Sequence, residues 1–210
     1  MKKRLLAPLS AADMPWPALP IIGIAGRARA GKDTVAQFIR EEYSCMTYAF
    51  AEPLKAMLRS IGLDESELNG WRKDEINNDF QATPRHMMQT LGTEWGRDTI
   101  NGDIWVIAAA KRLKRLNQAN PEKTILITDV RFENEASFVR ANGFLIHVER
   151  PIQRIDGSHH RSENQLRINE SDDLIIMNDG GLDDLREEAL RIAVEIHNTA
   201  IRSLEVRHAS

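Results

Sequence analysis

The chain has 210 residues and a formal net charge of −3, and 42% of its residues are hydrophobic and 28% charged. This length fits a single domain with a substantial core, and the near-neutral charge argues against a nucleic-acid surface. No apolar run is long enough to span a membrane, and the only cysteine, Cys45, cannot form an internal disulfide. We therefore expect a cytoplasmic protein without nucleic-acid or membrane partners.

Residues 1–19 contain several prolines and are predicted to form an irregular tail before one domain over 20–210. In this domain short apolar runs predict strands, and apolar residues at helical spacing predict helices between them. In chain order the predicted elements are a strand at 20–25, a helix at 32–43, a strand at 46–51, helices at 53–61, 83–91 and 103–117, a strand at 124–130, a helix at 133–142, strands at 144–149 and 173–178, and a helix at 182–204.

Local signals mark the ends of two of these helices. Thr83 followed by Pro84 is typical of an N-cap and a first helical residue, and Gly143 is typical of a C-cap. No element is predicted for the polar stretch 64–81. The alternation of strands and helices predicts an α/β fold with a mainly parallel sheet covered on both faces.

The stretch GIAGRARAGKDT (23–34) links the first strand to the first helix, which is the context of a phosphate-binding loop. Its glycines let backbone N–H groups point at phosphate oxygens, and Lys32 supplies a mobile positive charge. An ordinary tight turn between strand and helix is the alternative. The residues expected to bind a nucleotide here are Gly26, Arg29, Ala30, Gly31, Lys32, Asp33 and Thr34.

Asp33 occupies the position at which such loops usually carry a hydroxyl for magnesium. A carboxylate there can hold Mg²⁺ directly or through water, and Thr34 can supply the missing hydroxyl, so both remain candidates. Asp129 lies at the end of the strand at 124–130, at the edge where open α/β sheets bind ligands. It is the third candidate metal ligand and also a candidate catalytic residue. Capping of the following helix is the alternative role for Asp129.

Three stretches together resemble the deoxynucleoside monophosphate kinases best known from bacteriophages: GKDT, TPRHMMQTLGTEWGRD and ITDVRFENEA. The resemblance covers most of 21–185, and Asp33 is the usual residue of that family. It implies the P-loop nucleoside monophosphate kinase fold, a three-layer sandwich with a five-stranded parallel sheet of order 2-3-1-4-5. It also implies ATP as phosphoryl donor, a deoxynucleoside monophosphate as acceptor, Mg²⁺, and a homodimer.

Transfer of a phosphoryl group between two anionic nucleotides needs charge neutralisation and alignment, so arginines outside the phosphate loop are the expected tools. In an acceptor-binding region over about 52–105, Arg85 is placed to bind the acceptor phosphate. Gln89, one helical turn further, is placed to hydrogen-bond the acceptor base. Arg131 is expected to contact the acceptor or the transferring phosphate and to act in catalysis.

Two further positions in this region leave alternatives open. Trp95 either stacks on the acceptor base or packs in the core. Arg97 and Asp98 either bind substrate as a pair or form a structural salt bridge.

The polar segment over about 150–166 follows the fourth strand, where this fold carries a lid whose arginines close over the phosphates. The candidate arginines are Arg150, Arg154 and Arg161. Arg154 is predicted to be catalytic, whereas His159 and His160 are expected to be solvated or to bind phosphate rather than a metal. After the fifth strand, Asn178 is the expected contact of the donor adenine.

Two other functions remain alternatives. One is another small-molecule kinase of the same fold, such as a phosphomevalonate kinase, and the other is a nucleotide-binding switch that hydrolyses ATP slowly. An aromatic acceptor pocket with Trp95 would favour a nucleotide acceptor. Several arginines near the acceptor argue against a switch, because a switch needs no second phosphate site.

Overall fold

A single parallel sheet forms the centre of the protein in the computed structural model, which describes residues 20–151 and 166–208. The order of its five strands is β2-β3-β1-β4-β5 and every neighbouring pair is parallel, which confirms the order that the resemblance implied. The strands are β1 (Ile21–Ala25), β2 (Cys45–Tyr48), β3 (Thr124–Val130), β4 (Gly143–Glu149) and β5 (Leu174–Met177).

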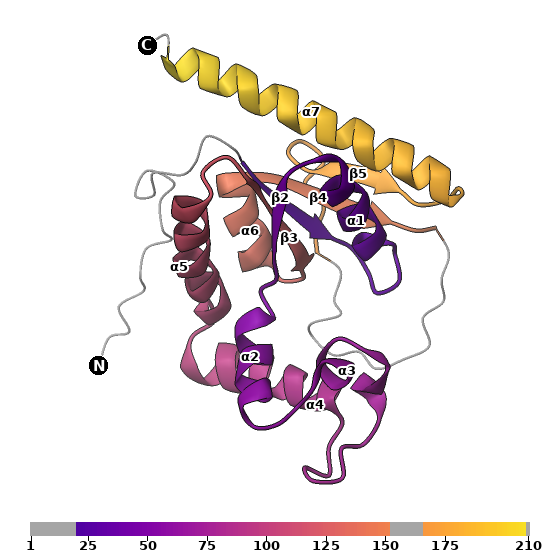
Figure 1. Cartoon of the computed structure of the whole chain (residues 1–210), viewed down its shortest axis with the longest axis vertical. Helices are drawn as coiled ribbons and strands as arrows, with labels where there is room; N and C mark the ends of the chain where they lie inside the picture. Colours follow the sequence, from indigo (N-terminus) through magenta and orange to yellow (C-terminus); the bar gives the residue numbers. More distant parts are fainter. Residues whose placement is uncertain (1–19, 152–165, 209–210) are drawn as a thin grey trace.

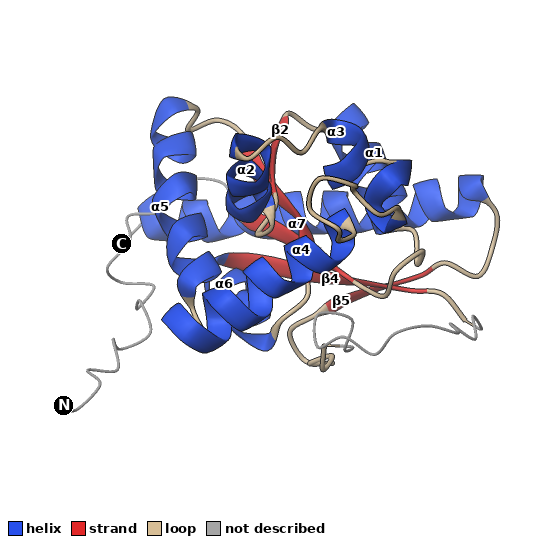
Figure 2. Ribbon diagram, turned by 90° about the horizontal axis from the view of Figure 1, so that it is seen from below, coloured by secondary structure: helices blue, strands red, loops and turns tan. Residues whose placement is uncertain are grey.

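Helices cover both faces of this sheet (Figure 1, Figure 2). The helices on one face are α1 (Lys32–Glu42) and α7 (Leu182–His208), and those on the other are α5 (Ile104–Ala119) and α6 (Glu133–Asn142). Among the helices of the described ranges, none combines the length and the apolar character that crossing a bilayer requires.

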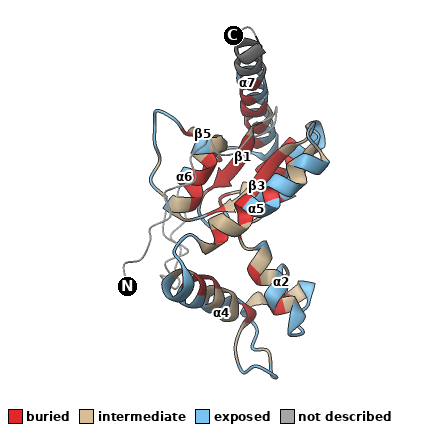
Figure 3. Cartoon of the chain, turned by 90° about the vertical axis from the view of Figure 1, so that its left-hand side faces the viewer, coloured by how far each residue is buried: buried red, intermediate tan, exposed pale blue. Residues whose placement is uncertain are grey.

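The apolar sequences of the central strands follow from this sandwich, because their residues face one layer of helices or the other. In β1, Ile22 and Ile24 join the core cluster with α1 and α7, whereas Ile21 and Ala25 join the cluster with α5 and α6. All residues of β1 are buried, as Figure 3 shows for the middle of the sheet. The predicted doubly covered sheet is therefore confirmed.

A helical arm, residues 52–100, leaves the sheet after β2 and returns at α5 (Figure 1). It consists of α2 (Glu52–Ser60), α3 (Glu65–Leu68), the 3₁₀ helix η2 (Trp71–Asp74), α4 (Pro84–Gln89) and the π-helix η3 (Thr90–Ile100). The arm has a small core of its own, formed by Leu58, Leu63 and Leu68 with Met87, Met88 and Leu91.

The arm also contains the main differences from the predicted elements. The N-cap of α4 is confirmed, because the Thr83 hydroxyl accepts the N–H of His86 at 3.2 Å. The helix does not end near Leu91, however, but continues as η3. The elements α3 and η2 lie in the stretch 64–81, where no element is predicted.

Gly143 follows α6 directly and is the first residue of β4. It takes an extended backbone with φ 167° rather than the left-handed conformation common at helix C-caps. Close packing explains the glycine instead, since an added Cβ would overlap the carbonyl oxygen of Ile21 on the paired strand β1.

Gly143→Ala should therefore lower the free energy of unfolding by about 1–3 kcal/mol or more, because two paired strands would have to move apart. Gly102→Ala is the matched control, since an added Cβ at Gly102 meets no atom within 4 Å. Denaturant unfolding of both variants measures the difference. Equal stability of the two variants would show that the packing of β1 against β4 does not require glycine.

Candidate active site

The loop between β1 and α1 has the backbone that a phosphate-binding loop needs. Gly26, Arg29 and Gly31 have positive φ values of 143°, 63° and 105°, a backbone conformation that occurs in anion-binding loops. Gly31 is the N-cap of α1, which directs the free N–H groups of that helix towards the loop. An added Cβ at Gly26 would meet the carbonyl oxygen of Val148, so this glycine allows the loop to pass over β4.

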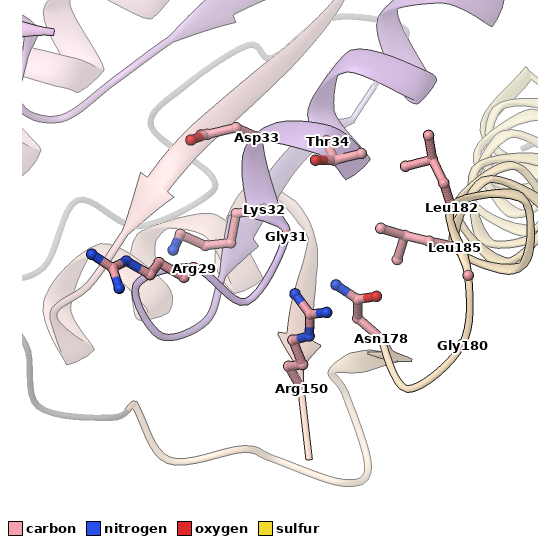
Figure 4. A pocket seen from close by; sticks show the side chains of 11 residues that line it. Arg29, Gly31, Lys32, Asp33, Thr34, Arg150, Asn178, Gly180, Leu182 and Leu185 are labelled. Carbon is pink, nitrogen blue, oxygen red and sulfur yellow. The ribbon is translucent and has the colours of Figure 1, made fainter. Parts of the chain in front are cut away.

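A cavity of about 440 Å³ opens beside this loop (Figure 4). Its lining comes from the loop and α1, from the segments after β4 and β5, and from the first turns of α7. The residues are Arg29, Gly31, Lys32, Asp33, Thr34, Arg150, Asn178, Gly180, Gly181, Leu182 and Leu185. Most of the predicted donor residues thus line one cavity, whereas Gly26 and Ala30 are not part of its lining. Leu182 and Leu185, which the sequence reasoning missed, give it an apolar side.

Asn178 connects the end of β5 with the phosphate-binding loop. Its side chain is buried, and its Nδ2 donates a hydrogen bond of 2.8 Å to the carbonyl oxygen of Ala30. An added Cβ at Gly31 would lie 2.6 Å from the same Nδ2. The side-chain amide therefore holds the loop in place, and a contact of Asn178 with adenine stays a prediction.

Lys32, Asp33 and Thr34 form the first turn of α1 (Figure 4). The Nζ atom of Lys32 donates to the carbonyl oxygen of Arg27 at 2.8 Å, so the ammonium lies across the loop. Asp33 is exposed, and both Asp33 and Thr34 line the cavity. Carboxylate and hydroxyl oxygens are ligands of the kind that Mg²⁺ prefers, and a metal-binding role of either residue stays a prediction.

Asp129 lies at the end of β3 and has two backbone partners. Its Oδ1 accepts the N–H of Phe50 at 2.7 Å and its Oδ2 accepts the N–H of Ala51 at 2.9 Å. Burial raises the pKa of this carboxyl, although the two N–H groups and Arg131 act in the opposite direction. The structure therefore gives Asp129 an anchoring role where the arm begins, and its role as a metal ligand stays a prediction.

Arg97 forms a buried ion pair with Glu135 of α6. The exposed fractions of the two side chains are 8% and 2%, so neither charge is solvated. Arg97 also donates to the carbonyl oxygen of Gly92 at 2.9 Å, and its guanidinium lies 3.7 Å from the ring centre of Phe132. These contacts favour the structural alternative for Arg97, with Glu135 as its partner.

Glu135 orients the segment that carries Arg131. Its Oε2 accepts the backbone N–H groups of Arg131 and Phe132 at 2.9 and 3.1 Å, which caps the start of α6. Burial and the negative charge of Asp129 raise the pKa of Glu135 to about 7, against the effect of Arg97. The positive charge of Arg97 thus opposes the rise in this pKa and favours the ionised form of the buried carboxyl.

The predicted acceptor residues all lie on the arm or beside it. On α4, Arg85 is exposed and donates to both carboxylate oxygens of Asp74, with 3.1 Å between NH2 and Oδ2. Gln89, at the end of α4, is half-buried. On η3, Asp98 is exposed, and Trp95 is 39% exposed with its ring tilted against Trp105 at 6.5 Å. Packing therefore leaves part of the Trp95 ring accessible, and base stacking stays a prediction.

Part of the predicted lid lies outside the described residues, including Arg154, Arg161, His159 and His160. Arg150 is described and lines the cavity beside Asn178 (Figure 4). Within the described ranges, no group of three His, Cys, Asp or Glu side chains could hold a metal ion.

The family model described as "Deoxynucleotide monophosphate kinase" matches residues 20–68 and 62–189. The chain belongs to this family. A putative deoxynucleotide monophosphate kinase of Acanthamoeba polyphaga mimivirus is 30% identical over 81% of this chain and 94% of that protein. The deoxynucleotide monophosphate kinase of Enterobacteria phage T4 is 27% identical over 80% and 95%, and the deoxynucleoside-5'-monophosphate kinase of Escherichia phage T5 is 25% identical over 60% and 73%.

Two of the stretches that carry the resemblance to this kinase family, TPRHMMQTLGTEWGRD and ITDVRFENEA, meet in the structure. Arg97 belongs to the first block and Glu135 to the second, and their ion pair joins the end of the arm to α6. The two blocks therefore form one structural unit, although 38 residues separate the two side chains along the chain.

Arg97→Met should destabilise the kinase by about 3–5 kcal/mol, because it leaves the Glu135 carboxylate buried without its cation. Arg115→Met removes the same charge from an exposed position on α5 and is the matched control. Thermal or denaturant unfolding compares the two variants. Similar stability of both would contradict the structural role of the Arg97–Glu135 ion pair.

Proposed function

We propose that the chain transfers the γ-phosphoryl group of ATP to the phosphate of a deoxynucleoside monophosphate. Membership of the deoxynucleotide monophosphate kinase family supports this reaction. The structural observation that carries the proposal is that all predicted parts of the site follow strands of the same sheet. The phosphate loop follows β1 and the arm follows β2, whereas Arg131, Arg150 and Asn178 follow β3, β4 and β5. In a parallel sheet these positions share the carboxyl edge, where donor and acceptor can lie close together.

The donor nucleotide occupies the cavity beside the phosphate loop. Its phosphates accept hydrogen bonds from backbone N–H groups of the loop and the start of α1, and Lys32 exchanges the Arg27 carbonyl for a phosphate oxygen. Leu182 and Leu185 form the apolar side of the cavity, which suits the adenine ring. Arg150 adds a positive charge to the lining of the cavity.

Asp33 and Thr34 would hold magnesium together with phosphate oxygens, since both line the cavity at the first turn of α1. When bound, the ion neutralises phosphate charge and orients the transferring group. Asp129 contributes by holding the turn that leads into the arm, through the N–H groups of Phe50 and Ala51.

The acceptor nucleotide binds between the arm and the turn after β3. Arg85 and Arg131 contact its phosphate, Gln89 hydrogen-bonds its base and Trp95 stacks on it. Little proton chemistry is needed, because the attacking group is a phosphate oxygen. Catalysis therefore rests on cations that hold the two phosphates in line, with Lys32 and Arg131 as the catalytic residues.

Family membership and the accessible ring of Trp95 favour a nucleotide acceptor over the acceptor of a phosphomevalonate kinase. They also favour a kinase over a nucleotide switch. Closure of a lid with Arg154 and a homodimer remain predictions from the resemblance, and a cytoplasmic location remains a prediction from the composition.

A coupled ADP-release assay across all deoxy- and ribonucleoside monophosphates tests the function. At least one deoxynucleoside monophosphate should be converted to its diphosphate with release of one ADP per product. Lys32→Met should lower kcat by about 10³-fold or more without unfolding the protein, because one cation is lost from the transition state.

Lys114→Met serves as the control for this assay, since Lys114 is exposed on α5, away from the phosphate loop. Release of ADP without phosphorylation of any monophosphate would show that the chain is an ATPase switch and not a kinase. Normal turnover of folded Lys32→Met would exclude the loop from the mechanism.

A further inference from the structure

The side-chain amide of Asn178 is fixed in one orientation by the phosphate-binding loop. Its Nδ2 atom donates a hydrogen bond of 2.8 Å to the carbonyl oxygen of Ala30. Only the amino end of an amide can donate to a carbonyl oxygen, so this bond determines which way the amide is turned. The Oδ1 atom therefore faces away from Ala30, and Figure 4 shows it on the side of Leu185.

Burial makes this orientation costly to reverse. Asn178 is only 8% exposed, and its backbone N–H donates to the carbonyl oxygen of Glu149 at 2.7 Å. A reversed amide would lose the hydrogen bond of Nδ2 and place Oδ1 against the carbonyl oxygen of Ala30. Two buried acceptor oxygens with no donor between them are unfavourable. The side chain thus presents an acceptor, and not a donor, on the side opposite Ala30.

The Oδ1 atom of Asn178 has no hydrogen-bond donor among residues 20–151 and 166–208. Asn178 lines the cavity beside the phosphate loop, so a nucleotide bound there can reach this oxygen. Polar groups at buried positions normally have a hydrogen-bond partner. A ligand group that donates to Oδ1 would therefore be favoured at this point of the cavity.

The position of this oxygen indicates which part of a donor nucleotide it meets. Residues 32–34, in the first turn of α1, line the part of the cavity proposed for the phosphates. Leu182 and Leu185 form the apolar side proposed for the base. Since the oxygen of Asn178 lies on the side of Leu185, it is placed to meet the edge of the base (Figure 4).

The group at C6 distinguishes the purine bases that could bind here. Adenine carries an amino group at C6, which donates hydrogen bonds, whereas guanine and hypoxanthine carry an oxo group, which accepts them. Against a fixed acceptor, the amino group forms a hydrogen bond and the oxo group does not. Arg150, beside Asn178 in the same cavity, carries only donors and would favour the oxo group, so a binding preference shows which of the two side chains meets C6.

We propose that Oδ1 of Asn178 accepts a hydrogen bond from the 6-amino group of the donor base and thereby selects ATP over 6-oxopurine nucleoside triphosphates. The inference rests on the proposed function and deepens it, because it assigns the base specificity of the donor site to one atom. The hydrogen bond to Ala30 is essential for this selectivity. An amide that could turn freely would offer Nδ2 to a 6-oxo group equally well.

The test compares the binding of ATP with that of ITP, which carries an oxo group at C6 of the base, by titration calorimetry. The wild type should bind ITP about ten- to a hundredfold more weakly than ATP, because the oxo group leaves a buried acceptor unpaired. In Asn178→Ala the ratio of the two Kd values should fall close to unity, mainly through weaker binding of ATP. A purely structural role of Asn178 would change both Kd values without changing their ratio.

Two further variants separate base recognition from support of the loop. Asn178→Asp keeps an acceptor but loses the amide donor to Ala30, so it should bind both nucleotides more weakly and still prefer ATP. Leu182→Ala removes an apolar contact at an exposed position and should weaken both nucleotides equally.

Four results would each overturn the proposal: equal Kd values of ATP and ITP in the wild type, tighter binding of ITP, an undiminished preference for ATP in Asn178→Ala, or its loss in Asn178→Asp. The wild-type comparison needs no substitution, so it tests the proposal even where a variant does not fold.

These outcomes are distinct from failure of the proposed function. If the wild type phosphorylates a deoxynucleoside monophosphate but binds ATP and ITP alike, the kinase stands and the role of Asn178 falls. If it prefers ATP through Asn178 without phosphorylating any monophosphate, the donor site stands and the kinase reaction falls. Failure of the wild type to bind any nucleoside triphosphate would overturn both.

Discussion

The buried ion pair of Arg97 and Glu135 is the contact on which the active-site geometry depends. Taking two charges out of water is costly, and this cost is offset only where both groups have further partners. Arg97 has the Gly92 carbonyl and the Phe132 ring, and Glu135 has two backbone N–H groups. One of these N–H groups belongs to Arg131, the arginine expected to bind the acceptor. The ion pair that attaches the arm therefore also orients the segment around Arg131.

A second buried carboxylate holds the other end of the arm. Asp129 accepts both N–H groups of the turn at Phe50 and Ala51, just before α2 begins. The arm between these two attachments has only a small apolar core of its own, so its position relative to the sheet depends on polar contacts at its ends. This arrangement gives the stretches TPRHMMQTLGTEWGRD and ITDVRFENEA a structural role, in addition to any contact with substrate.

Much of the fold could be predicted from the sequence, because strands that are buried on both faces are almost continuously apolar. The phosphate loop was equally visible, since its glycines and Lys32 stand at fixed spacing between a strand and a helix. The short helices α3 and η2 were missed because polar contacts hold them: Asp64 and Glu67 cap each other, and Arg72 pairs with three acids.

Contacts between distant residues were the other limit. Nothing local in the sequence indicates that Asn178 binds Ala30, which precedes it by 148 residues, or that Arg97 pairs with Glu135. By contrast, the apolar start of α7 at Leu182 and Leu185 follows a glycine pair, a local signal that could have indicated a wall of the donor cavity.

In the proposed function, two phosphate sites lie next to each other at one edge of the sheet. A bisubstrate analogue, in which a chain of phosphates joins adenosine to the preferred deoxynucleoside, tests this claim most directly. The analogue should bind with one molecule per chain, more tightly than either substrate, and should be displaced by ATP and by the monophosphate alike. Displacement by ATP but not by any monophosphate would contradict this arrangement, because the second phosphate site would then not adjoin the first.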